Sequence, residues 1–233
     1  MAFKKRYILA GLTTALAAAF SQFPASWIAP LTGMNLPIKP GGTLWEGYVP
    51  AINAVPPIKF KTRLAGLVTE TPLLEFGGNG NGLFVTGTAD RDQISVLTLQ
   101  GDAVFLGQID GRLSNLTGVF DLAARNIRFN GDCIGVSGQV STDILTQNEA
   151  LWQWRGPPLS GPITCENNVL TTTLSGNIPG QSVEAVLKII PDGTYQIRAV
   201  INTNTPEAGL VLPLYGFEAQ GERYTMNEAG RWM

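Results

Sequence analysis

The residues that could do acid–base or nucleophilic chemistry are carboxylates and two cysteines, because the chain contains no histidine. Histidine is the commonest general base and the usual partner of a serine or cysteine nucleophile, so its absence disfavours most hydrolytic mechanisms. Asp90 with Asp92, and Glu218 with Glu222, could each lie on one face of a strand, as the carboxylate pair of a glycosidase requires. Such carboxylates are more often part of a solvated face. We therefore expect no enzymatic activity, no catalytic residue and no cofactor.

Cys133 and Cys165 are the two cysteines of the chain. We expect them to form a disulfide if this part of the protein is exported, because disulfides persist in oxidising compartments. Closing a loop of about 30 residues would stabilise the fold by about 3 to 4 kcal/mol in the chain-entropy model. Two buried free thiols are the alternative. A metal site is not expected, since two sulfurs without histidine leave a tetrahedral zinc ion half-coordinated.

The N-terminal residues bear on the compartment. Residues 1–6 form a basic cap that holds Lys4, Lys5 and Arg6, and residues 7–29 form an apolar segment. We expect this segment to be a transmembrane anchor, because its apolar character continues to Trp27, where an interfacial ring would lie. A cleaved signal peptide is the alternative. In both cases the positive-inside rule places residues 30–233 outside the membrane.

The exported part should form an all-β domain. Scattered glycines and prolines, 27 and 15 in number, indicate many short elements joined by turns. Apolar residues alternate along residues 183–189 and 195–201, which predicts a hairpin around Pro191–Gly193. Residues 143–151 form at most one short helix. Because the strand faces are only half apolar, we expect a curved or rolled, mainly antiparallel sheet with one wet face.

Further strands and turns follow from β-branched runs and from turn-forming residues. The strands are expected at residues 94–97, 104–109, 127–129, 134–140, 170–174 and 217–224. The turns are expected at Gly77–Gly80, Asp110–Gly111, Asn130–Gly131 and Asn167–Asn168. The formal net charge is −2 and no basic stripe follows the N-terminal cap, which disfavours nucleic acid as a partner.

Two tryptophan-containing segments could be binding sites or packing devices. The first consists of Gly42, Thr43, Leu44, Trp45, Glu46 and Gly47. We expect its glycines to bracket a short first strand whose Trp45 ring fills the end of the rolled sheet, the alternative being contact with a partner or a membrane. In the second, Trp152 and Trp154 should point to one side of an extended segment. They would form an aromatic staple for a long β connection or, alternatively, a platform for a ligand, and we favour the staple.

Four segments, taken in order, resemble protein N of the bacterial type II secretion system. They are FPASWIAPLTGMNLPIKPGGTLWEGYVP, CIGVSGQV, GPITCENNVLTTTLSG and IIPDGTYQIRAVI. The resemblance implies a single-pass inner-membrane protein with a β-rich periplasmic domain. It also implies an accessory, non-catalytic role in exporting folded proteins across the outer membrane, with other inner-membrane secretion subunits as partners. That family is distantly similar to AsmA-like envelope proteins, so the alternative function is lipid binding in a β-sheet groove.

Overall fold

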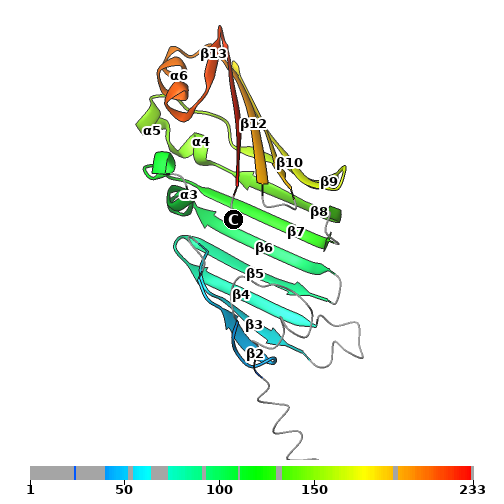
Figure 1. Cartoon of the computed structure of the whole chain (residues 1–233). Coiled ribbons are helices and arrows are strands. Elements are labelled where there is room, and N and C mark those ends of the chain that lie inside the picture. Colours follow the sequence, from blue (N-terminus) through cyan, green and yellow to red (C-terminus); the bar gives the residue numbers. More distant parts are fainter. Residues whose placement is uncertain are drawn as a thin grey trace, which may run out of the picture.

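The computed structural model describes Pro24 and residues 40–51, 55–63, 73–90, 93–109, 111–129, 133–190 and 194–231. Within these residues the chain forms one 14-stranded antiparallel sheet that remains open at both edges (Figure 1). The prediction of a mainly antiparallel β fold is confirmed. The predicted basic cap and anchor, residues 1–6 and 7–29, lie outside the described residues apart from Pro24. In the part of the chain that is described, no helix has the length and apolar character needed to cross a membrane.

The strands follow chain order across the sheet except at one edge, where the order is β12-β14-β13. They are β1 (Gly41–Gly42), β2 (Glu46–Val49), β3 (Ile58–Thr62), β4 (Leu74–Gly80), β5 (Leu83–Ala89), β6 (Ile94–Asp102), β7 (Val119–Phe129), β8 (Cys133–Thr142), β9 (Leu159–Glu166), β10 (Val169–Ile178), β11 (Gln181–Ile189), β12 (Thr194–Thr203), β13 (Glu218–Gln220) and β14 (Arg223–Arg231). The helical segments are α3 (Ala103–Ile109), η3 (Gly111–Leu113), α4 (Ile144–Gln147), α5 (Glu149–Trp152), α6 (Pro206–Val211) and η4 (Leu212–Tyr215).

The topology brings these helical segments to one end of the strands. Alternate strands of an antiparallel meander run in the same direction, so β6, β8 and β12 all finish at the same end. The pair α3 and η3 follows β6, α4 and α5 follow β8, and α6 and η4 follow β12. The helices accordingly lie along one side of the sheet in Figure 1. We call this the helical end, and the opposite end, where β9 turns into β10, the turn end.

The sheet has one apolar and one polar face, because side chains alternate along each strand. On the apolar face, residues paired across neighbouring strands include Val85, Leu99 and Leu122, and further along the sheet Ile163, Thr172, Leu187 and Ile197. On the polar face the corresponding pairs include Thr86 with Thr98 and Lys188 with Gln196. The half-apolar strands of the sequence therefore give a sheet with two chemically different surfaces.

Aromatic rings lie over glycines of the neighbouring strand at five places in the sheet. The pairs are Tyr48 with Gly41, Phe60 with Gly47, Phe76 with Gly87, Phe120 with Gly101 and Tyr195 with Gly230. A Cβ added to any of these glycines would collide with ring atoms of its partner. These glycines are therefore needed for cross-strand packing within the sheet.

The predicted C-terminal hairpin is confirmed. Val183 lies opposite Ile201, and Ile189 lies opposite Tyr195, while the turn residues 191–193 lie outside the described residues. The turn at residues 167–168 is also confirmed, since it joins β9 to β10 with positive φ at both asparagines. A left-handed conformation at two successive residues is typical of a tight hairpin turn.

Four local predictions were wrong. The expected strand over residues 217–224 is a hairpin, because β13 ends at Gln220 and β14 begins at Arg223. Residues 104–109, expected as a strand, belong to α3, where the N–H of Phe105 donates a hydrogen bond to Oδ1 of Asp102 at 3.3 Å. A helix-starting aspartate of this kind outweighs the apolar run that follows it. The expected turn at residues 77–80 lies within β4, and the chain reverses instead at Asn81 and Gly82, both with positive φ. Residues 143–151 contribute to two short helices, α4 and α5, where we expected at most one.

Candidate functional site

The disulfide joins two strands at the turn end. Cys133 begins β8 and Cys165 lies near the end of β9, and their Cα atoms are 5.6 Å apart in the bonded pair. The described ladder between these strands runs from Gly138 with Ile163 towards the helical end, so the bond connects the strands beyond their ladder. The predicted disulfide is therefore present. The N–H of buried Cys133 also donates to the Asn168 carbonyl at 2.9 Å, which fixes the β9–β10 turn to β8.

The segment around Trp45 is a tight hairpin turn, so the expected single strand was wrong. β1 ends at Gly42 and β2 begins at Glu46. The N–H of Thr43 donates to the Glu46 carbonyl at 2.9 Å, and its Oγ1 accepts a hydrogen bond from the Glu46 N–H at 3.2 Å. Gly42 has a φ of 84°, which glycine adopts without steric cost. Gly42 and Thr43 together set the reversal that the sequence analysis missed.

Trp45 lies in this turn with its side chain half-buried. The turn is attached to β3 through Thr62, whose hydroxyl donates to the Leu44 carbonyl at 2.6 Å and whose N–H donates to the Trp45 carbonyl at 2.8 Å. Part of the residue therefore packs against the sheet while part faces solvent. Whether the ring serves packing or a partner stays a prediction to be tested.

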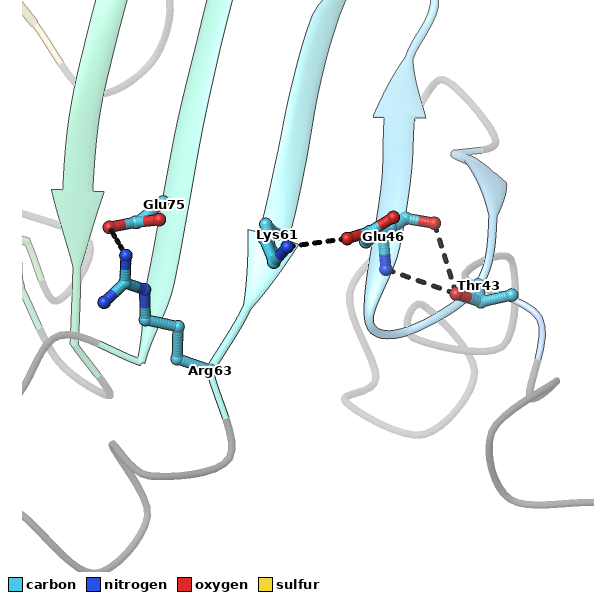
Figure 2. A network of polar contacts seen from close by, with 5 residues as sticks. All are labelled: Thr43, Glu46, Lys61, Arg63 and Glu75. Atoms are coloured by element: carbon cyan, nitrogen blue, oxygen red, sulfur yellow. Dashed lines mark hydrogen bonds and ion pairs between the residues drawn. The ribbon is translucent and has the colours of Figure 1, made fainter. Parts of the chain in front are cut away.

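Alternating charges cross the polar face beside the hairpin (Figure 2). Glu46 and Lys61 are paired in register across β2 and β3 and form an ion pair at 2.8 Å, and Arg63 contacts Glu75 at 2.6 Å. The hydrogen bond from Lys61, aided by the attraction of its charge, lowers the pKa of Glu46, and the same contact raises the pKa of Lys61. Exposed ion pairs add little to stability, so this row chiefly sets the charge pattern of the surface.

Trp152 and Trp154 lie together at the helical end, although their segment is not extended as predicted. Trp152 ends α5, Gln153 turns the chain with a φ of 52°, and the two ring centroids are 6.0 Å apart. Nε1–H of Trp152 donates to the Tyr215 hydroxyl at 3.1 Å, and Nε1–H of Trp154 donates to Oε1 of Gln181 at 2.9 Å. These bonds fasten the β8–β9 connection to η4 and to β11.

The two rings form part of the wall of an apolar cavity of about 450 Å³. One side of the cavity is the apolar face of β11, β12 and β14, including Leu187, Ile197 and Met226. The other side consists of the helical connections, including Leu113 of η3 and Leu212 of η4. The volume falls within the range of about 300 to 1,000 Å³ that is usual for small-molecule sites.

A buried asparagine holds the connections above this cavity together. Asn148, between α4 and α5, accepts a hydrogen bond from the Thr117 N–H at 3.0 Å and donates to the Thr117 and Ile144 carbonyls at 2.7 Å. It therefore ties the β6–β7 connection to the β8–β9 connection. Within the described part of the chain, no buried side-chain nitrogen or oxygen lacks a hydrogen-bond partner.

The side of the cavity that the helices form was not predicted from the sequence. One signal was present before α6, where Thr205 occupies the N-cap position, Pro206 begins the helix and Glu207 lies in the first turn. Proline at the first helical position with an acid beside it is a recognised start signal. Leu212 and Tyr215 had no such signal, because their role depends on the distant strands against which η4 packs.

The carboxylates considered for catalysis are not gathered into a site among the described residues. Asp90 accepts a hydrogen bond from the Ser95 hydroxyl, and Asp92 lies outside the described residues. Glu218 and Glu222 are exposed on β13 and in the turn that follows it. No group of three or more histidine, cysteine, aspartate or glutamate side chains in the described ranges could hold a metal ion.

Comparisons with known proteins found no match for the chain among family models, curated proteins or solved structures.

Proposed function

We propose that this protein is an accessory, non-catalytic subunit of the bacterial type II secretion machinery. Residues 7–29 would anchor it in the inner membrane and residues 30–233 would lie in the periplasm. The observation that carries the proposal is the ordered resemblance of four segments to protein N of that machinery, of which the Gly42–Gly47 segment is the most specific. A β-rich body with a disulfide agrees with what the resemblance implies.

In this proposal the hairpin around Trp45 lies close to the membrane. Pro24, within the predicted anchor segment, forms an isolated β-bridge with Thr43 of the hairpin. The surface beside the hairpin carries the exposed Glu46–Lys61 ion pair and the half-buried Trp45 side chain. Inner-membrane secretion subunits would contact this surface, and no cofactor, metal ion or nucleic acid would take part.

A deletion strain tests the proposal. Loss of the protein should reduce secretion of folded substrates, and the full chain should restore it. Complementation with Glu46→Lys should restore secretion poorly if the surface beside the hairpin meets a partner. Glu184→Lys, an exposed reversal on the polar face of β11, is the matched control and should restore secretion fully. Wild-type secretion in the deletion strain would refute the proposal.

Lipid binding is the second candidate, and the open part of the apolar face favours it. A sheet with one apolar face normally buries that face against a second layer. The described helices cover only the helical end, and in β3 and β4 the side chains of Ile58, Phe60 and Phe76 are half-buried. Acyl chains laid along this face would complete its burial. Altered outer-membrane permeability in the deletion strain, with normal secretion and phospholipid bound to the purified protein, would favour this function.

A further inference from the structure

The cavity at the helical end differs from the open apolar face because it lies between two layers, with an opening to solvent. Its strand side and its connection side both present apolar side chains, and Glu228 is the single charged residue among the described residues that line it. Glu228 already interacts with another residue of the protein. The cavity therefore offers apolar contact as its main source of binding free energy.

The indole N–H groups of the wall are already satisfied within the protein. The two indole N–H groups donate to Tyr215 and Gln181, and Tyr215 is thereby held edge-on against Trp152, with ring centroids 5.6 Å apart. A sugar, nucleotide or peptide would lose hydrogen bonds to water on entering and would find few in return. The wall therefore selects an apolar ligand by shape and excludes strongly polar ones.

Water that enters this cavity gains few hydrogen bonds from its walls. A buried water needs about two to four polar partners, which these walls do not supply. An empty space forfeits the dispersion contacts of the side chains around it, and native interiors keep few voids larger than one water molecule. An apolar molecule removes both penalties, so the cavity has the properties of a binding site.

The cavity is elongated along its floor, because its lining residues on β12 extend from Tyr195 to Ile201, about 20 Å at about 3.3 Å per residue. Beside this floor, in register, lies the central hydrophobic cluster of the sheet. Leu187 in the cavity lies opposite Thr172, and Thr172 lies opposite Ile163 of the central hydrophobic cluster. The Thr172 hydroxyl donates to the Pro162 carbonyl at 2.9 Å, so this buried polar group is satisfied within the sheet. Thr172 and Ile163 are themselves buried, so this side of the sheet is already covered. The long, narrow floor therefore suits a linear chain better than a compact apolar molecule.

From these observations we infer that the cavity binds one unbranched aliphatic chain, the chemistry shared by free fatty acids and phospholipid tails. The inference deepens the lipid-binding candidate, on which it rests, by giving the ligand a position beneath the helical connections. It is independent of any role in secretion.

Photocrosslinking of the full chain in phospholipid nanodiscs tests the inference. One arm uses a free 16-carbon fatty acid with a diazirine on its chain, and the other uses a phospholipid with the same group in one tail. The adducts should concentrate on the segments that hold Trp152, Leu187 and Leu212, and their mass identifies the source of the chain. Labelling in either arm supports the inference.

A matched pair of variants on β11 gives the control. Leu187→Trp fills the cavity from the apolar face and should reduce labelling of these segments about tenfold or more. Lys188→Trp places the same ring on the exposed polar face of the same strand and should leave labelling unchanged. If Leu187→Trp does not fold, Met226→Trp blocks the cavity from β14 instead. Equal labelling in blocked and control variants, or no labelling of these segments in either arm, would overturn the inference.

Secretion by the deletion strain, measured beside cavity labelling, separates this inference from the proposed function. Cavity labelling together with normal secretion in the deletion strain would retain the ligand and remove the role in secretion. A secretion defect without cavity labelling would keep the role in secretion and overturn the inferred ligand.

Discussion

The two parts of this sheet bury the same kind of apolar face to different extents. In the open region, β2 to β4, the strands contain no fully buried residue. In the covered region, β9 to β14 with the helical connections, Trp154 and Ile201 are each only 1% exposed. Alternation along the strands is similar in both regions, so the difference arises from what covers the face. A single twisted sheet half-buries its apolar residues, and full burial requires a second layer.

Truncation of Trp154 should have the largest effect, because this ring is the most buried aromatic group of the covered region. Trp154→Ala should lower the free energy of unfolding by about 3 to 5 kcal/mol through lost contacts and the space left behind. Phe76→Ala in the open region should cost clearly less, since its ring is half-buried. Denaturant unfolding of both variants measures the contrast, and equal losses would show that the regions are packed alike.

Removal of the disulfide should have the second-largest effect on stability. Cys133→Ser with Cys165→Ser should lower stability by about 3 to 4 kcal/mol in the chain-entropy model, because the bond closes a long loop. The bond joins β8 to β9 at the border of the covered region, so we expect the strands on both sides of it to lose amide protection. Hydrogen exchange of the double variant checks this. Unchanged stability would mean that the ladder alone fixes these strands.

Trp45→Ala measures how strongly a half-buried ring of the open region stabilises the fold. A half-buried ring removes less apolar surface from water than a core ring, so we expect a loss of about 1 to 2 kcal/mol. Thermal melting measures the effect. A loss as large as that of Trp154→Ala would reveal a packed core around the hairpin. Unchanged stability combined with loss of an envelope partner would assign the ring to an interface.

The smallest effect concerns the exposed ion pair of the open region. The pKa of Glu46 is lowered from its ordinary value of 4.5, so its contribution to stability is present above pH 4.5 and is lost as the pH falls through the lowered folded value. Wild type and Glu46→Gln should therefore converge in stability in acid. An NMR titration should find the Glu46 pKa below 4.5 in the wild type and nearer 4.5 in Lys61→Met. An unchanged value in Lys61→Met would contradict the contact.

Within the covered region, β10, β11 and β12 were predictable because their signals are local. Residues 183–189 and 195–201 alternate with period two, and the observed register pairs their apolar faces. The asparagines at 167 and 168 tolerate the positive φ of a tight turn, and the sequence shows them directly. The disulfide followed from cysteine number and compartment, although its position relative to the β8–β9 ladder did not.

The helical connections and the cavity were not predictable, because their cause is long-range. Residues 104–109 have an apolar composition that suits either a strand or a buried helix. Asp102 before them was a local helix-start signal that we did not use, and the burial of α3 against the sheet depends on the fold. Gly47 was interpreted as a bracket of a strand, yet it makes room for the Phe60 ring on the next strand. Such roles appear only when the register is known. The cavity further requires three connections from distant parts of the chain to meet.

Crosslinking of the anchored protein in its native envelope tests the proposed function most directly. We expect the full chain, crosslinked in the membrane and purified under denaturing conditions, to carry inner-membrane subunits of the type II secretion machinery. Lys188→Trp, altered on the polar face of the covered region, should recover the same subunits as the wild type. If none of these subunits is recovered and phospholipid is the bound component, the proposed role in secretion is contradicted and lipid binding remains as the function.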